Sequence, residues 1–209
     1  MRRIVLYIFI LFAPLLGGCD KSFNFIGEVD SSLTIIYATT DGEPINISRI
    51  DGISVESNRY KGGVGIMKFS KPISRIDDYC FYNATTLQNI TLPKSITKIG
   101  RLAFKNCISL KGIFLPESIT KIGESAFVNC SVLKTITIPE GVTEIGMLAF
   151  DYCSALTTIY CKPSTPPTIY NWSFGEEVSG RKIYVPRASV EAYKNSWKTY
   201  ADLIVGYDF

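Results

Sequence analysis

Apolar side chains recur every 23 residues through the middle of the chain. Four successive segments repeat one order of apolar residues (isoleucine or valine, isoleucine, phenylalanine, leucine, isoleucine), and they begin at Ile73, Ile96, Ile119 and Val142. One such segment cannot bury these side chains alone, but segments stacked with parallel strands about 4.8 Å apart can. The pattern therefore predicts a β-rich solenoid of four to five short coils.

Each coil is expected to carry two short strands, with the patterns Ile-x-x-Ile and Leu-x-x-Ile-x-Leu, joined through a turn or a single helical turn. The fifth position of the repeat holds Gly100, Gly123 and Gly146, with Asp77 in the first repeat. Glycine adopts positive φ freely, and Asp tolerates it better than most residues, so this column predicts a turn with positive φ. Prolines end the second strand of the first three repeats, at Pro93, Pro116 and Pro139.

The segments on either side of the repeats, which occupy residues 73–162, are expected to seal the stack, because an open solenoid end exposes its apolar interior. Residues 33–72 predict a small antiparallel β cap, with strands at 33–40, 52–57 and 65–69 and a turn at Asp41-Gly42. Residues 163–209 predict a strand-plus-short-helix cap, with strands at 181–185 and 203–205 around a helix N-capped by Ser189.

The first eighteen residues have the layout of a secretory signal peptide. Arg2 and Arg3 precede an apolar run at 4–16, which is too short to span a bilayer comfortably. The run ends in Leu16-Gly17-Gly18-Cys19, which resembles the lipobox of bacterial lipoproteins. The resemblance implies cleavage before Cys19 and acylation of that residue, with residues 19–32 as a tether. An ordinary signal peptide with an incidental cysteine is the alternative. Lipidation would place the chain in the bacterial cell envelope, at the outer membrane or cell surface.

The repeat itself carries a family resemblance. The pattern I-x-x-I-G-x-x-A-F-x-x-C-x-x-L-x-x-I-x-I-P over residues 73–161 resembles the BspA-type leucine-rich repeats of bacterial surface proteins. The flanks at 36–45, 55–73 and 183–200 are similar to the terminal pieces of that family. The resemblance implies a β-rich leucine-rich-repeat solenoid exposed at the cell surface. For some members it also implies adhesion to host proteins or other cells.

Composition and charge exclude several classes of function. Hydrophobic residues make up 46% of the chain, which is ample for a core. The formal charge of +3 falls by two when the signal peptide is removed, and no dense basic patch remains to bind nucleic acid. Histidine is absent, which excludes Ser-His-Asp and Cys-His nucleophiles and imidazole metal ligands. The carboxylates are scattered, so we expect no enzyme, no metal and no cofactor.

The cysteines of the repeats fall in columns of small or apolar residues. Cys107, Cys130 and Cys153 share one inward column with Ala84, whereas Cys80 and Cys161 align with alanine and with leucine or isoleucine. An exported protein could form disulfides from such neighbours. Three cysteines in one column cannot all pair with each other, however, and a free thiol fills a small apolar site without distortion. We therefore expect buried, reduced thiols.

The second strand of each coil also points residues outward, in columns that join Asn89, Gly112, Thr135 and Thr158, and Thr91, Phe114, Thr137 and Tyr160. Outward aromatic residues beside threonine and lysine are typical of contact surfaces, which gives a candidate ligand-binding set of Lys111, Phe114, Lys134, Thr135, Thr137 and Tyr160. The alternative is that these residues simply favour strands.

A second outward column, of Arg75, Lys98, Lys121 and Glu144, predicts a solvated face whose positive charge is offset by Asp78, Glu117, Glu124 and Glu140. Together these features predict a lipid-anchored, non-enzymatic surface module that binds a protein or glycan through its repeat face. The alternative is a structural or spacer protein of the envelope with no specific ligand.

Overall fold

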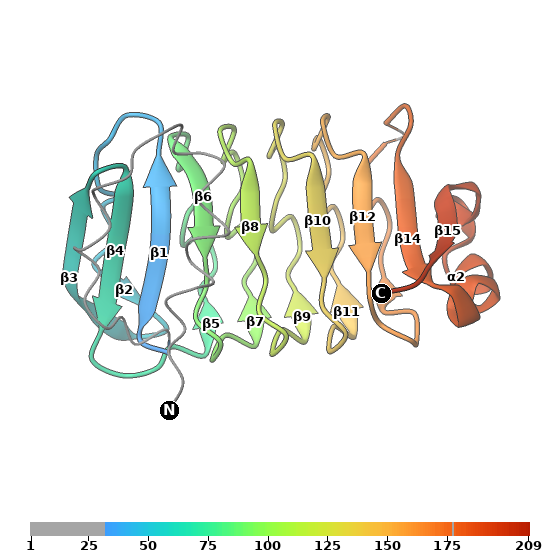
Figure 1. The fold of residues 1–209 in the computed structure, drawn as a ribbon, viewed down its shortest axis with the longest axis horizontal. Coiled ribbons are helices and arrows are strands. Elements are labelled where there is room, and N and C mark those ends of the chain that lie inside the picture. Colours follow the sequence, from blue (N-terminus) through green and yellow to red (C-terminus); the bar gives the residue numbers. More distant parts are fainter. Residues whose placement is uncertain (1–31, 177) are drawn as a thin grey trace.

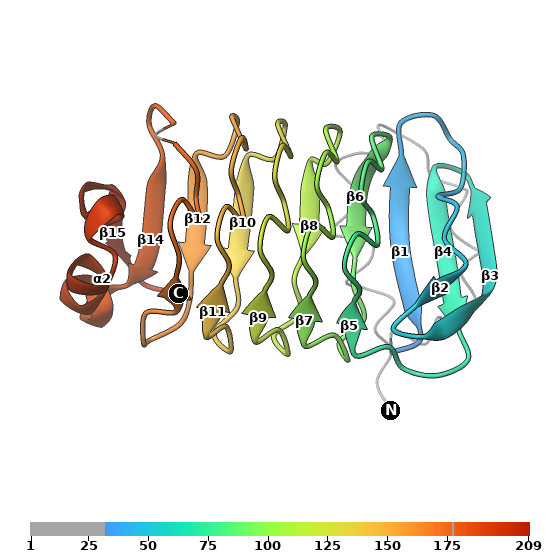
Figure 2. The same ribbon diagram turned by 180° about the vertical axis from the view of Figure 1, so that it is seen from behind.

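The chain forms an elongated stack of coils with a β cap at one end and a small helical cap at the other (Figures 1 and 2). This is a computed structural model, and it describes residues 32–176 and 178–209. The predicted signal peptide, Cys19 and all of the tether before Ser32 lie outside the described residues. Within the described part, no helix is long and apolar enough to cross a membrane.

Every repeat contributes one longer strand and one two-residue strand, and equivalent strands of successive coils pair in parallel, except that β8 and β10 lie in separate sheets. The longer strands are β6 (Leu87–Thr91), β8 (Gly112–Phe114), β10 (Thr135–Ile138), β12 (Thr158–Cys161) and β14 (Lys182–Pro186). The short ones are β5 (Arg75–Ile76), β7 (Lys98–Ile99), β9 (Lys121–Ile122), β11 (Glu144–Ile145) and β13 (Thr168–Ile169). The register is one repeat per coil, since Ile76 pairs with Ile99 and Ile99 with Ile122. The predicted solenoid with parallel strands is confirmed.

A fifth coil follows the four repeats found in the sequence. Strand β13 pairs with β11, and β14 pairs with β12 so that Ile159 lies opposite Ile183. Phe174 stacks on Phe150 at 5.7 Å between ring centroids and so continues the phenylalanine column. The sequence hides this coil because Pro163, Pro166 and Pro167 interrupt the apolar period before it.

The N-terminal cap is antiparallel, and its strands are β1 (Thr34–Thr39), β2 (Arg49–Ile50), β3 (Ile53–Lys61) and β4 (Val64–Phe69). Strand β1 lies between β4 and β6, pairs with both, and is buried along its whole length. Strand β1 therefore covers the edge that β6 of the first coil would otherwise expose. The antiparallel strands added beyond it seal that end of the stack.

The C-terminal cap consists of the 3₁₀ turns η2 (Arg187–Ser189) and η3 (Lys198–Leu203), the helix α2 (Val190–Ser196) and the strand β15 (Ile204–Tyr207). Buried aromatic residues hold it to the fifth coil: Tyr193 Oη donates to the Pro163 carbonyl at 2.7 Å, and Trp197 Nε1 donates to the Pro167 carbonyl at 2.9 Å. Ser189 occupies the predicted N-cap position but makes no capping hydrogen bond, because its hydroxyl donates to the Ser164 carbonyl instead.

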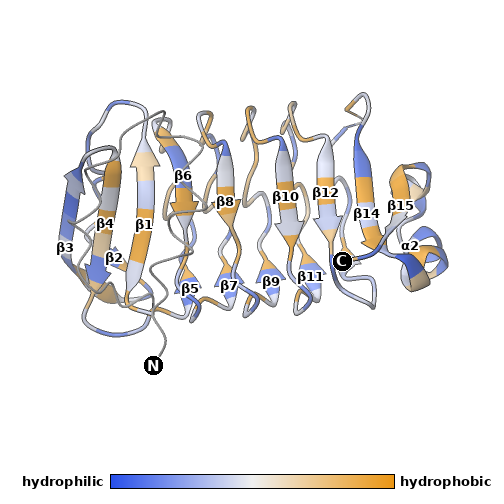
Figure 3. Cartoon of the chain, in the orientation of Figure 1, coloured by the Kyte–Doolittle hydropathy of each residue, from blue (hydrophilic) through white to orange (hydrophobic). Residues whose placement is uncertain are grey.

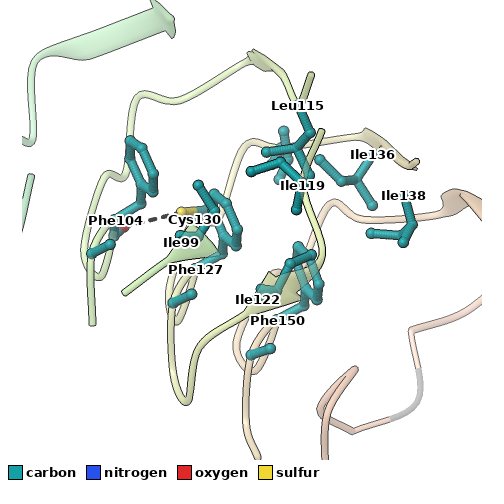
Figure 4. Close-up of a cluster of buried hydrophobic side chains, with 14 of the residues drawn as sticks. Ile99, Phe104, Leu115, Ile119, Ile122, Phe127, Cys130, Ile136, Ile138 and Phe150 are labelled. Carbon is teal, nitrogen blue, oxygen red and sulfur yellow. Dashed lines mark hydrogen bonds between the residues drawn. The ribbon is translucent and has the colours of Figure 1, made fainter. Parts of the chain in front are cut away.

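The core is a set of columns that run the length of the stack. The rings of Phe81, Phe104, Phe127 and Phe150 lie nearly parallel, with neighbouring centroids 5.0 to 5.1 Å apart. Beside them the thiols of Cys107, Cys130 and Cys153 donate to carbonyls of the preceding coil, as Cys130 does to Phe104 at 3.3 Å (Figure 4). All five cysteines in the described part are free. Each of the three thiols in this column thus fills space and donates to a carbonyl at once.

The glycine column has a different cause from the one predicted. Gly100, Gly123 and Gly146 do not have positive φ. Instead, a Cβ built on Gly123 would lie 2.7 Å from the backbone carbon of Gly100, so the column is where successive coils come closest. Positive φ falls on two neighbouring columns occupied by non-glycine residues: Tyr79, Leu102, Ser125, Leu148 and Trp172, and Asn83, Asn106, Asn129 and Tyr152.

Candidate binding face

The outward side chains of β8, β10, β12, β14 and β15 make up one side of the solenoid, called the front face below. Hydropathy alternates along these strands, with polar outward positions between apolar inward ones (Figure 3). The pairing aligns Thr91 with Phe114, Thr137 with Tyr160, and Tyr160 with Tyr184. The outward columns are therefore those that the repeat predicts, extended by one strand.

The six predicted binding residues all lie on this side of the solenoid. Phe114 is 45% exposed, and Lys111, Lys134, Thr135 and Thr137 are also exposed, whereas Tyr160 is half-buried. Of these six, Thr137 and Tyr160 line a groove at the C-terminal half of the face. The two lysines and Phe114 lie outside its lining.

The front face does not extend to the first coil. Asn89 is predicted to head an exposed column, yet it is only 8% exposed and lies opposite Ala38 of β1. Ala38 and Ile36, also of β1, are buried and pack with Val64. The prediction that Asn89 is exposed is therefore wrong, because the cap adds strands beyond the first coil.

The groove has a volume of about 1200 Å³ and lies at the C-terminal ends of β10, β12 and β14. Its lining comes from β10, β12, β14 and β15 and from the segments that follow these strands and β8: Glu117, Thr137, Glu140, Tyr160, Lys162, Ser164, Pro186, Arg187, Ala188, Tyr207, Asp208 and Phe209. Its size is that of a site for a side chain or a small ligand rather than for a whole domain.

Aromatic rings from separate coils meet along this groove. Tyr160 lies 5.2 Å from Tyr184, 5.3 Å from Tyr207 and 6.3 Å from Phe209, measured between ring centroids. Strand β15 ends at Tyr207, which lies opposite Pro186 of β14, and the chain then runs across the lower end of β14 toward β12 (Figure 1), so that Tyr207 and Phe209 both reach the Tyr160 ring. Phe209 remains 53% exposed, so the cluster offers apolar surface to solvent.

Ion pairs border the aromatic cluster. Lys162 Nζ lies 3.0 Å from Glu117 Oε1, and Arg187 Nη2 lies 2.9 Å from Asp208 Oδ2. The Arg187 side chain donates hydrogen bonds to Asp208, which lowers the pKa of that carboxyl and raises the pKa of the guanidinium. Glu140 is the third carboxylate, and its Oε1 accepts a hydrogen bond from the Ser164 amide at 3.1 Å.

Sequence reasoning missed most of this lining. Tyr184 lies in a predicted strand, but the broken period concealed that β14 continues the repeat and aligns with Tyr160. A search for aromatic residues at outward positions of that strand would have found it. Tyr207 and Phe209 carry no comparable signal, because only the path of β15 and of the residues after it places them on the front face.

The short strands form the opposite, charged face. Their register aligns Arg75, Lys98, Lys121 and Glu144 as predicted. The compensating charges are not those predicted: Lys121 Nζ pairs with Glu144 at 2.7 Å, and Arg75 pairs with Asp51 and Asp77. In Figure 3 blue, hydrophilic colour recurs at the short strands β5, β7, β9 and β11.

The described residues offer little for catalysis. They contain no cluster of histidine, cysteine or acidic side chains that could hold a metal ion. Burial raises the pKa of Cys80, Cys107 and Cys161 to about 12, so these thiols stay protonated at neutral pH and are poor nucleophiles. The arrangement can bind a partner at the front face, and the core thiols serve packing.

The chain is similar to known proteins through its repeats. A family model described as a BspA type leucine-rich repeat region matches residues 60–198 in six copies. No curated protein matches the chain.

Several solved structures are similar to it. A leucine-rich-repeat protein of T. pallidum is 25% identical with a TM-score of 0.50, and the match covers 56% of this chain and 53% of that protein, so the chain spans about half its length. A leucine-rich-repeat protein of Bacteroides capillosus is 32% identical over 51% of this chain and 73% of its own, with a TM-score of 0.41. A leucine-rich cell surface protein of Faecalibacterium prausnitzii is 25% identical over 80% of this chain and 52% of its own, also with a TM-score of 0.41.

Proposed function

We propose a surface-binding role for this chain, which belongs to the BspA-type leucine-rich-repeat family. In this role the chain is a lipid-anchored module of the bacterial cell surface that binds a protein or a glycan through its front face. Its action is binding alone, since the chain has no histidine and the thiols with raised pKa values are buried.

The exposed aromatic groove is the observation that carries the proposal. Tyr207 and Phe209 in its lining are 41% and 53% exposed, and Phe114 on the same face is 45% exposed, so this face offers apolar surface of the kind that interaction sites use. Aromatic residues with polar neighbours dominate the energetics of protein contacts. The opposite face has a pocket of about 630 Å³ between Arg75 and Glu124, but the described residues that line it are charged or aliphatic and include no aromatic ring.

The anchor rests on Leu16-Gly17-Gly18-Cys19. Expression of the full chain and of Cys19→Ala in a Gram-negative host fed with a labelled fatty acid tests it. The proposal expects label on the wild type only. Label on both proteins, or on neither, would contradict lipidation at Cys19.

Binding is tested with arrays of host matrix proteins and of glycans, probed with the full chain in detergent micelles. We expect at least one reproducible ligand whose binding saturates. A failure to bind any component, by a chain shown to be folded by its thermal transition, would favour a structural spacer instead.

A further inference from the structure

The groove on the front face carries one carboxylate more than its cations can neutralise. Its lining includes Glu117, Glu140 and Asp208 but only two cations, Lys162 and Arg187. Lys162 is held by Glu117 and Arg187 by Asp208. The remaining charge is therefore that of Glu140.

Glu140 is poorly compensated where it lies. It is exposed, and its one hydrogen bond comes from the Ser164 amide at 3.1 Å. Within residues 32–176 and 178–209 no lysine or arginine forms an ion pair with it. A ligand that brought a cation here would gain an ion pair without breaking one.

Aromatic rings line the same groove as this charge. Tyr160, Tyr207 and Phe209 lie within 5.0 to 6.3 Å of one another, measured between centroids. The faces of such rings attract lysine and arginine side chains, and several rings with a carboxylate nearby form a general receptor for organic cations. A neutral glycan would stack on the rings but would leave the Glu140 carboxylate without a counter-ion.

We propose that this groove binds a lysine or arginine side chain presented by a partner protein, with the cation over Tyr160 and Tyr207 and with Glu140 as its counter-ion. The inference rests on the proposed front-face function and supplies the chemistry of the partner. It places the recognition element at the end of the stack formed by the fifth coil and the C-terminal cap.

The test titrates the full chain in micelles with the peptide acetyl-Gly-Gly-Arg-Gly-Gly-amide, and with the same peptide carrying neutral citrulline. Glu140→Gln and Tyr207→Ala probe the groove. Glu56→Gln is the matched charge control, because Glu56 is an exposed carboxylate of β3 at the other end of the stack. Tyr82→Ala is the matched aromatic control, since Tyr82 and Tyr207 are both 41% exposed. Thermal melts verify that each variant folds.

The proposal expects the arginine peptide to bind at least about fivefold more tightly than the citrulline peptide, and each groove variant to lose about fivefold in affinity while both controls keep it. An equal loss of affinity in Glu56→Gln and Glu140→Gln would show that only the net charge of the protein matters, and it would overturn the proposal. Absence of arginine preference would also overturn it. If array binding then still depends on Tyr207, the front-face function stands without a cation site; if no binding depends on that face, both proposals fall.

Discussion

At the scale of single residues, two different constraints act on each turn of the solenoid. The glycine column marks close contact between backbones, since Gly146 has the backbone of Glu124 within 2.5 Å of where a Cβ would lie. The two columns with positive φ are occupied by Leu102, Ser125 and other residues with side chains. The sequence shows that glycine is required, but it does not show whether φ or space is the reason.

Substitution of two residues in one coil separates these reasons. Gly123→Ala should lower the free energy of unfolding by about 1–3 kcal/mol or more, because its Cβ would collide with the backbone of Gly100. Ser125→Gly, at φ 53°, should change it by less than about 0.5 kcal/mol, because relief of the left-handed conformation offsets the added freedom of the unfolded chain. Denaturant melts measure both, and equal effects would contradict the assignment.

The buried thiols make stability depend on pH. Burial raises the pKa of Cys107 from 9.0 to about 12, so the folded chain keeps a proton that the unfolded chain loses. Their contribution is complete below pH 9 and is lost as the pH rises toward 12. We expect the urea midpoint to fall over this range, and to fall less steeply in Cys107→Ala, which imitates Ala84 of the first repeat. An unchanged slope in that variant would show that the thiol is not shielded.

At the scale of elements, the first coil differs from later coils because no preceding coil offers a carbonyl to its backbone amide. The Thr97 amide donates to the Ser74 carbonyl of the coil before it, and Thr120 repeats this one coil later. No coil precedes Ser74, and the Asp51 carboxylate takes that place: its Oδ2 accepts from the Ser74 amide at 2.7 Å and from the Ser74 hydroxyl at 2.8 Å. One side chain thus joins the N-terminal cap to the solenoid.

Removal of the Asp51 carboxylate should destabilise the fold. Asp51→Ala should lower the free energy of unfolding by about 0.5–1.5 kcal/mol, since it removes the carboxylate that accepts from the Ser74 amide and hydroxyl, while water can reach the exposed Ser74. Burial works against the charge of Asp51, but hydrogen bonds from Ser74 and the charge of Arg75 prevail and lower its pKa. Its contribution is therefore present above the unfolded pKa of 3.8 and is lost as the pH falls below it. Acid titration of the two proteins should show the difference shrinking below this pH, and a constant difference would contradict the role of the carboxylate.

The strands of the repeats could be predicted because each column holds the same residue type in four copies. Ile76 and Ile99 pair as the 23-residue period requires. The caps do not repeat, so only their strand propensity was visible: β3 extends to Lys61, beyond the predicted end at residue 57. Ser189 makes no capping hydrogen bond, because its hydroxyl donates to Ser164, a partner too distant in sequence to be predicted.

At the scale of the whole molecule, the stack presents two unlike faces and one specialised end. The short strands carry a charged column in which Lys121 pairs with Glu144, whereas the front face carries threonine and aromatic side chains. The outward columns follow from the repeat alone. The groove could not be predicted from the repeat. It needs the fifth coil to bring Tyr184 beside Tyr160, and it needs β15 and the residues after it to bring Tyr207 and Phe209 there.

The central claim is that the front face, and not the opposite one, binds a partner. Two threonines of the third repeat offer a matched test: Thr137 is exposed on β10 at the groove, and Thr120 is exposed just before β9 on the opposite face. Dissociation constants of the full chain, Thr137→Lys and Thr120→Lys are measured for the array component that the wild type binds most tightly. We predict that Thr137→Lys weakens binding at least about tenfold, or about 1.4 kcal/mol, and that Thr120→Lys leaves it unchanged. Equal affinities of the three proteins, or a loss confined to Thr120→Lys, would contradict the account.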